Sequence, residues 1–256
     1  MEVEFLFLAL GVAALFAGFV DSIVGGGGLI QLPALFTAYP GVAPATLFGT
    51  NKLASVIGTT SAAIQYSRRV AIPWAVAAPG AVAALVGSWF GAKAVAFLDP
   101  ALLRPLILML MVLVAVYTFV RKDLGSISTE PIHGARSVTL AVSIGAVVGF
   151  YDGFFGPGTG SFLIFLFIRF LGMDFLRASV TAKILNVATN VAAIAYFAGN
   201  VELMWQLAAL MAVCNLTGSV VGSRMAMRHG TGFVRKMFLA VVSVLIARLA
   251  YDTFLR

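Results

Sequence analysis

Two matching sets of charged and glycine-rich residues stand out inside apolar parts of this sequence. Each set contains an aspartate, a glycine-rich stretch that begins four residues later, and a lysine further along the chain. The sets are Asp21, Gly25, Gly26, Gly27, Gly28 and Lys52, and Asp152, Gly156, Pro157, Gly158, Thr159 and Lys183. A charge in an apolar stretch costs free energy unless it is paired or used. Because lysines and free backbone N–H groups bind anions, the two sets predict a site for a small oxyanion.

The glycine-rich stretches predict interruptions of helices. Glycine permits backbone angles that other residues resist, and Pro157 prevents continued helical hydrogen bonding behind it. A helix that restarts after such a break exposes N–H groups that attract anions. A simple kink or close helix packing is the alternative. No GKS or GKT follows either stretch, which excludes a nucleotide-binding P-loop.

Polar side chains accompany both lysines at helical spacing. They are Ser55 and Thr59 after Lys52, Asn186 and Asn190 after Lys183, and Asn51 directly before Lys52. Residues three and seven positions after a lysine share one helix face with it. We therefore expect these side chains to add hydrogen-bond donors to the predicted anion site.

The aspartates leave three roles open, because a carboxylate repels an anionic substrate. Asp21 and Asp152 could each hold a lysine, accept hydrogen bonds from the glycine-rich stretch, or take up a proton during transport. We favour the partner role over proton coupling, which stays open. If the lysines are purely structural, the alternative is that each pairs with the aspartate of its own half of the chain.

Residues for metal, cofactor or covalent chemistry are scarce. His133 and His229 lie in polar connectors, and Cys214 is the single cysteine. Two histidines and one cysteine are poor material for a zinc or haem site. No histidine lies within an apolar segment to activate a nucleophile. The sequence predicts no metal, no cofactor and no enzymatic activity.

The composition indicates the elements that must position these residues. Of 256 residues, 61% are hydrophobic and only 11% are charged, against about 25% charged in soluble domains. The fold class predicted is an all-α polytopic membrane protein. Long apolar segments lie near residues 4–24, 44–66, 73–97, 101–121, 137–155, 175–198, 204–227 and 233–254. Shorter ones near 29–38 and 160–171 follow the glycine-rich stretches and predict broken or re-entrant helices.

The net charge of +7 does not indicate nucleic acid binding. The basic residues occur in short pairs between apolar segments, such as Arg68 with Arg69. Such pairs mark membrane boundaries and contact lipid headgroups. Membrane lipids and a small anion are therefore the predicted partners, and a homo-oligomer is left open.

The chain matches itself when it is shifted so that Asp21 falls on Asp152, a shift that we call the internal offset. At this offset Gly18, Phe19, Gly25, Gly27, Thr50, Lys52 and Trp74 fall on Gly149, Phe150, Gly156, Gly158, Thr181, Lys183 and Trp205. The spaced glycines of 87-GSWFGAK-93 fall on those of 218-GSVVGSR-224 and predict close helix packing. We predict two transmembrane repeats, 1–121 and 137–256, joined by the polar connector 122–136. Transporters place their sites between such repeats, which are inverted or parallel; the sequence leaves this open.

The motifs also resemble those of a known family. D-x-x-x-G-G-G-G-L with G-T-N-K, repeated as D-G-F-F-G-P-G-T-G with T-A-K-I-L-N, resembles the sulfite exporter TauE/SafE family, also called TSUP. The resemblance covers almost the whole chain. It implies a multi-pass inner-membrane permease for small sulfur-containing anions such as sulfite, sulfoacetate, thiosulfate or other organosulfonates. Alternatives are a permease or channel for another small solute, or a membrane assembly subunit without transport.

Overall fold

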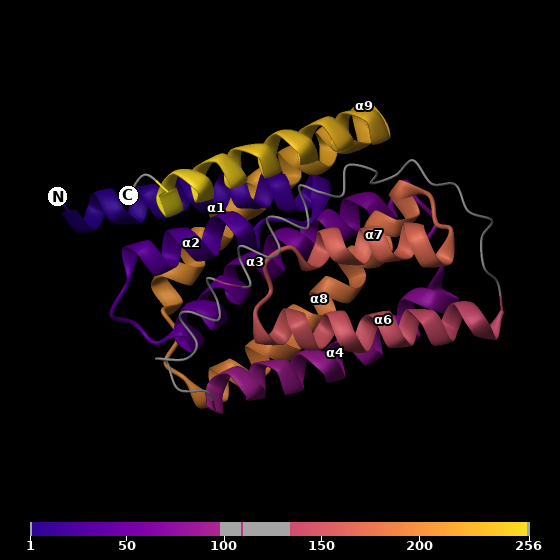
Figure 1. Cartoon of the computed structure of the whole chain (residues 1–256), viewed down its shortest axis with the longest axis horizontal. Helices are drawn as coiled ribbons and strands as arrows, with labels where there is room; N and C mark the ends of the chain where they lie inside the picture. Colours follow the sequence, from indigo (N-terminus) through magenta and orange to yellow (C-terminus); the bar gives the residue numbers. More distant parts are fainter. Residues whose placement is uncertain (1, 98–108, 110–133, 255–256) are drawn as a thin grey trace.

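The computed structural model describes residues 2–97, 109 and 134–254, and these form helices without any strand. The helices are α1 (Glu2–Val24), α2 (Gly28–Ala38), α3 (Pro44–Ser67), α4 (Trp74–Phe97), α6 (Ala135–Phe154), α7 (Thr159–Leu171), α8 (Phe175–Asn200) and α9 (Trp205–Phe254) (Figure 1). The predicted segment 101–121, apart from residue 109, and the connector 122–136, apart from residues 134–136, lie outside the described residues.

Five of the described helices are long and apolar enough to cross a membrane: α1, α4, α6, α8 and α9. This agrees with the predicted all-α, multi-pass membrane protein. Helices α2 and α7 have only 11 and 13 residues. At about 1.5 Å per residue, neither spans a hydrocarbon layer of about 30 Å by itself.

Two details differ from the expected segments. Helix α3 has 24 residues but is not among the five apolar helices, because its sequence is rich in threonine, serine and glycine. The expected segments 204–227 and 233–254 belong to one helix, α9, in place of two. In Figure 1 the yellow C-terminal part of α9 points back toward the end of the molecule where both termini lie.

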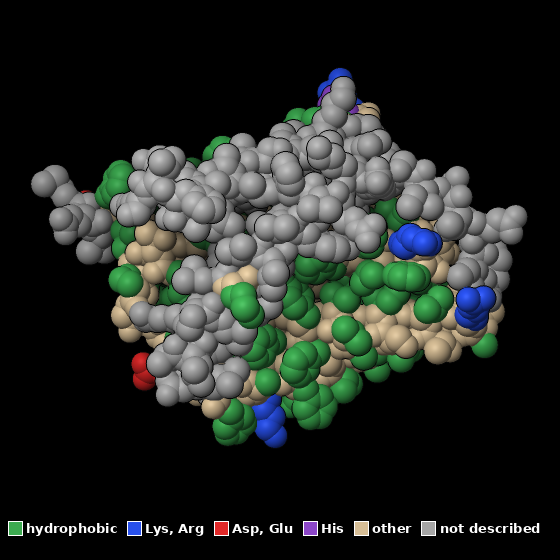
Figure 2. Space-filling model, viewed as in Figure 1, with side chains coloured by type: hydrophobic (Ala, Val, Ile, Leu, Met, Phe, Trp, Pro, Cys, Tyr) green, Lys and Arg blue, Asp and Glu red, His purple; other side chains and the backbone are tan. Residues whose placement is uncertain are grey.

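The outer face is apolar, as lipid contact requires. Large apolar side chains are exposed along the long helices, among them Val82 and Phe90 on α4 and Val147 on α6. Figure 2 shows many hydrophobic side chains among the described elements on this face and only a few basic ones near its edges. In a soluble protein such contiguous apolar surface would be a liability.

Close contacts between glycine and backbone define which helices run side by side. Gly218 of α9 packs against Leu15 of α1, and Gly222 packs against Phe19. Since both numbers increase together, α1 and α9 are parallel. Spaced glycines allow two helix backbones to approach closely, as their spacing in the sequence predicts.

The same type of contact joins α4 to α6. Gly87 of α4 packs against the carbonyl of Ala146, and Gly91 packs against that of Phe150. These two helices are therefore also parallel to each other. A helix from the first half of the chain thus packs on one from the second half, and the same is true of α1 and α9.

Helices α3 and α8 are antiparallel. Gly49, near the start of α3, packs against Phe197, near the end of α8. At the other end, the Nζ of Lys183 lies 4.9 Å from the ring centroid of Tyr66. Helix α3 is parallel to the first part of α9. The N–H of Met204 donates to the Thr50 hydroxyl, and further along both helices the Ser219 hydroxyl donates to the Gly58 carbonyl.

Helix α8 is parallel to α4 and packs beside it. The Ser88 hydroxyl donates to the Thr189 carbonyl at 2.7 Å, and the ring of Trp89 contacts that of Tyr196. Helices α1 and α3 and the N-terminal half of α9 therefore point one way, and α4, α6 and α8 point the other way. The internal offset also relates the helix starts at positions 28, 44 and 74 (α2, α3 and α4) to those at positions 159, 175 and 205 (α7, α8 and α9).

We expect Gly91→Ala to destabilise the protein by about 1–3 kcal/mol, because overpacking a tight contact has this cost. A Cβ on Gly91 would overlap the Phe150 carbonyl and crowd the backbone nitrogen of Phe154. Gly199→Ala on α8 is the matched control, since no atom lies within 4 Å of its Cβ position. Thermal unfolding in detergent measures both. Equal effects would contradict the close packing of α4 on α6.

Candidate functional site

The two glycine-rich stretches interrupt the helices, as their composition predicts. Gly25 lies between α1 and α2 with φ +79°, and Gly156 and Gly158 lie between α6 and α7 with φ +96° and +81°. Such positive φ values favour glycine over residues with a Cβ. We call residues 25–27 the first break and residues 155–158 the second break.

The two breaks lie against each other. The N–H of Ser161, at the start of α7, donates to the Gly25 carbonyl at 3.2 Å. The Ser161 hydroxyl donates to the Val24 carbonyl at 2.7 Å. Gly160 packs directly on Gly25, and Gly28 packs on Pro157. Two segments from opposite halves of the chain therefore form one centre.

A buried ion pair crosses this centre. The Nζ of Lys52 on α3 lies 2.5 Å from Oδ2 of Asp152 on α6, and both side chains are buried. A Cβ on Gly156 would lie 3.2 Å from this Nζ, so the second break brings its backbone close to the ammonium group. A side chain at residue 156 would narrow this space.

Lys183 has a different environment. Its Nζ lies 3.4 Å from the backbone carbonyl of Asp21 and over the ring of Tyr66. No carboxylate of a described residue lies within 4 Å of this Nζ. The residue is nevertheless buried, with only 3% of its surface exposed. It is a buried cation whose positive charge is compensated less directly than that of Lys52.

The carboxylate of Asp21 supports the first break. Oδ1 accepts a hydrogen bond from the N–H of Gly27 at 3.2 Å, and Oδ2 accepts one from the Thr59 hydroxyl at 3.1 Å. Its negative charge also attracts both Lys52 and Lys183. Asp21 therefore bonds to loop N–H groups, while Asp152 holds a lysine.

The pairing of each lysine with the aspartate of its own half is wrong for this structure. Lys52 of the first half pairs with Asp152 of the second half, and Lys183 contacts the backbone of Asp21 in the first half. The crossing follows from the helix directions, because α3 and α8 are antiparallel and bring their lysines to α6 and α1, respectively. Within one half, the lysine and aspartate form no ion pair.

Several of the other polar residues expected at the site bond to protein groups. Ser55 donates to the Oε1 of Gln31 at 3.1 Å, and Thr159 donates to the Gly156 carbonyl at 2.7 Å. Asn190 donates to the side-chain oxygen of Asn186 at 3.0 Å. Several polar side chains that follow Lys52 on α3 and Lys183 on α8 therefore already have hydrogen-bond partners within the protein.

Asn51 is an exception among the expected residues. It is buried, and its Oδ1 has no hydrogen-bond partner among the described residues. Gly26 and Gly27 complete the first break, and Gly28 begins α2. Only Gly25 of the four adjacent glycines has a positive φ. Gly27 and Gly28 allow close contact with the backbone of Ala17 and of Pro157, whereas the nearest atoms at Gly26 belong to side chains at ordinary distances.

Two polar residues near the site were not expected from the sequence. Gln31 on α2 is fully buried, and its Oε1 also accepts from the Nδ2 of Asn215 on α9 at 3.4 Å. The Nε2 of Gln31 has no partner among the described residues. Their counterparts at the internal offset are Phe162 and Ala84, so the comparison of the two halves did not reveal them. A polar residue inside an otherwise apolar helix is the signal that could have found them.

Comparisons with known proteins now decide the family. The family described as "Sulfite exporter TauE/SafE" matches residues 10–249. The chain belongs to this family. A "Probable membrane transporter protein YfcA" of Escherichia coli (strain K12) is 34% identical over 249 residues, which cover 96% of this chain and 91% of the relative.

Two further TauE/SafE relatives match over a similar range. A "Probable membrane transporter protein ORF9" of Sinorhizobium sp is 33% identical over 95% of this chain and 92% of its own length. A "Probable membrane transporter protein" of Haemophilus influenzae is 30% identical over 92% of this chain and 91% of its own length. No solved structure matches the chain significantly.

The TauE/SafE match includes both breaks and both lysines. The names of the family and its relatives are those of membrane transporters, not of enzymes. Among the described residues, no group of three or more His, Cys, Asp or Glu side chains is arranged to hold a metal ion. The chain is therefore a multi-pass membrane protein of a transporter family.

Proposed function

We propose that this chain is a secondary transporter that moves small sulfur-containing anions, such as sulfite, sulfoacetate, thiosulfate or other organosulfonates, across the inner membrane. The description of the TauE/SafE family supports the substrate class. In this proposal the anion binds where the two breaks meet, and Lys183 and Lys52 are its charged ligands.

The observation that carries the proposal is the crossed arrangement of lysines and breaks. Each lysine contacts an aspartate of the other half of the chain: Lys52 pairs with the carboxylate of Asp152 next to the second break, and Lys183 contacts the backbone carbonyl of Asp21, in the last turn of α1 before the first break. Helices α2 and α7 both begin at the breaks, and helix N-termini carry positive partial charge. A scaffold has no need for a buried lysine and a helix start from each half at one point, whereas an anion site uses them all.

We further propose that the chain consists of two inverted repeats. The common offset of the helix starts supports this, as do the opposite directions of α1 and α6, of α3 and α8, and of α4 and α9. Hydrogen bonds also recur at the same offset: Ser88 donates to the Thr189 carbonyl, and Ser219 donates to that of Gly58. Inverted-repeat transporters bind substrate at the repeat interface, next to discontinuous helices.

The two lysines would act differently during transport. Lys183 is not paired with a carboxylate and can accept an anion without breaking an ion pair. Lys52 already donates to Asp152, and this carboxylate would compete with the anion for its positive charge. A proton taken up by Asp152 would neutralise this competing carboxylate, which is how proton coupling would enter. Asp21 would remain bonded to Gly27 and Thr59 and keep the first break in place.

Uptake into proteoliposomes tests the proposed function. The purified chain is reconstituted, and uptake of sulfite, sulfoacetate, thiosulfate, taurine, sulfate, acetate and chloride is measured with and without an imposed proton gradient. We expect saturable uptake of at least one sulfur anion above that of protein-free vesicles. Uptake of chloride or acetate alone would contradict the substrate class, and no uptake of any anion would contradict anion transport.

A further inference from the structure

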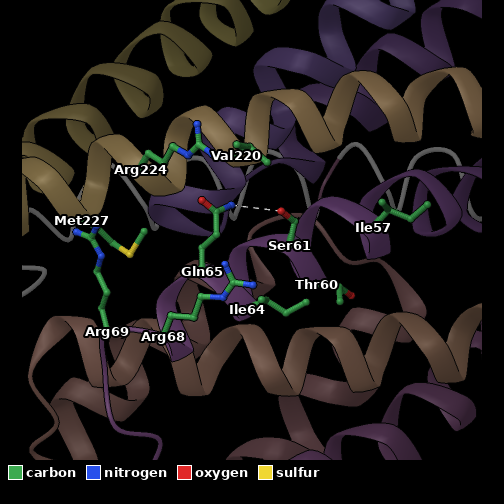
Figure 3. Close-up of a pocket in the computed structure, with 10 residues that line it drawn as sticks. All are labelled: Ile57, Thr60, Ser61, Ile64, Gln65, Arg68, Arg69, Val220, Arg224 and Met227. Carbon is green, nitrogen blue, oxygen red and sulfur yellow. Dashed lines mark hydrogen bonds between the residues drawn. The ribbon is translucent and has the colours of Figure 1, made fainter.

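A pocket lies away from the two breaks, between the C-terminal half of α3 and the middle of α9. It has a volume of about 540 Å³ and is lined by Ile57, Thr60, Ser61, Ile64, Gln65, Arg68, Arg69, Val220, Arg224 and Met227 (Figure 3). None of the aspartates, lysines or glycines of the proposed transport site lines it. The proposed function therefore leaves this cavity, which we call the arginine pocket, without a role.

One end of the arginine pocket is strongly basic. Arg68 and Arg69 come from the end of α3 and Arg224 comes from α9, so two helices contribute cations to one space (Figure 3). All three are exposed, and no carboxylate of a described residue lies within 4 Å of them. Guanidinium groups bind phosphate oxygens through paired, charge-assisted hydrogen bonds.

Neutral donors accompany the arginines. Gln65 donates from its Nε2 to the Ser61 hydroxyl at 3.2 Å, and both side chains line the pocket (Figure 3). Thr60 adds a further hydroxyl on the same helix. Phosphate esters accept hydrogen bonds from such groups in addition to the charged ones.

Exposed apolar side chains also line the pocket. Ile57 and Ile64 on α3 are 46% and 48% exposed, and Val220 lies on α9 (Figure 3). Ile57 and Arg68 are about three helical turns apart, or about 16 Å at the usual rise. A pocket with cations at one end and exposed apolar side chains along α3 fits an anionic amphiphile better than a free anion.

The lining of the pocket differs from that of the corresponding place at the internal offset. The counterparts of Gln65 and Val220 are Tyr196 and Trp89, whose ring centroids lie 5.4 Å apart. The three arginines correspond to Gly199, Asn200 and Lys93. The chain therefore departs from its own internal match here, with smaller side chains in place of two aromatic rings and with more positive charge.

We propose that the arginine pocket binds the phosphate headgroup of an anionic membrane lipid, with its acyl chains lying along Ile57 and Ile64. Basic pockets between membrane helices are suited to such headgroups. A bound lipid would connect α3, which carries Lys52, to α9. The site would thus hold together two helices that pack beside the first break.

Thermal unfolding of the full chain in neutral detergent tests this inference without any transport substrate. Phosphatidylglycerol, phosphatidylcholine and inorganic phosphate are titrated separately. We expect phosphatidylglycerol to raise the unfolding temperature, because a ligand that binds the folded state stabilises it. Phosphatidylcholine and inorganic phosphate should not reproduce the rise. An equal rise with phosphatidylcholine, or with phosphate alone, would overturn the assignment of an anionic lipid.

Two kinds of variant locate the effect. Replacing Arg68 and Arg224 together by glutamine should weaken the apparent affinity for phosphatidylglycerol about thirtyfold. Val220→Trp copies the counterpart Trp89 and should abolish the effect while keeping every charge. Lys93→Gln, at the position corresponding to Arg224, is the control and should respond like the unaltered chain. Undiminished affinity in both pocket variants, each compared with its own lipid-free baseline, would overturn the proposal.

Discussion

Lys52→Ala is expected to lower the free energy of unfolding by about 3–5 kcal/mol, because it leaves a buried carboxylate without its partner. The ion pair between Lys52 and Asp152 is buried on both sides. The unpaired Asp152 would have to be neutralised or hydrated inside the fold. Thermal unfolding in detergent, with exposed Lys93→Ala as a control for the loss of a lysine, measures the effect.

Removing both partners provides the decisive comparison. The double variant Lys52→Met with Asp152→Leu deletes both charges, and replacing a buried ion pair by apolar groups is often neutral or stabilising. We therefore expect it to be more stable than Lys52→Ala alone, and still unable to transport. If the double variant is as unstable as the single one, the loss of stability comes from packing around Lys52 and not from an unpaired carboxylate.

Lys183→Gln is expected to abolish most anion binding at a much smaller cost in stability than Lys52→Ala. Lys183 pairs with a backbone carbonyl and a ring, so its removal leaves no carboxylate partner unpaired within 4 Å among the described residues. A hydrogen bond to a charged group contributes about 1.5–3 kcal/mol, which corresponds to about 10- to 150-fold in affinity. Each unlabelled anion is tested for inhibition of the uptake of a radiolabelled sulfur anion, which measures anion affinity. Thermal unfolding measures stability, so the two effects are separated.

Three outcomes of the Lys183 experiment have clear meanings. Weakened uptake with a stable protein supports Lys183 as an anion ligand. Unchanged uptake contradicts that role. Uptake that is lost only in proportion to the amount of folded protein contradicts it as well, since it assigns Lys183 to the fold. Lys183→Arg is the matched variant, because it keeps the charge and changes the shape of the donor.

The sequence predicted the helical, membrane-spanning character and the positions of both breaks. Apolar length identifies the long helices, and the breaks follow from glycine, since Gly25, Gly156 and Gly158 all have positive φ. Helix α3 was less apolar than expected because the same residues that mark the candidate site also lower its hydropathy. These features are local, which is why the chain reveals them without a structure.

The partner of each lysine could not be predicted in the same way. Each half contains one aspartate and one lysine at matching positions, so the sequence is equally compatible with pairing within a half and with pairing between halves. The choice depends on helix direction, which follows from tertiary packing between α3 and α8. Gln31 and Asn215 were missed for the opposite reason, because each occurs in only one half.

The packing of first-half helices on second-half helices, α4 on α6 and α1 on α9, has a consequence for biosynthesis. Helix α4 leaves the ribosome well before α6, on which Gly87 and Gly91 pack, and α1 waits still longer for α9. Domains usually fold in order as they emerge. Here the first half of the chain enters the bilayer with its most closely matched helix surfaces facing lipid. Assembly is completed only near the end of translation, when α9 can pack on α1.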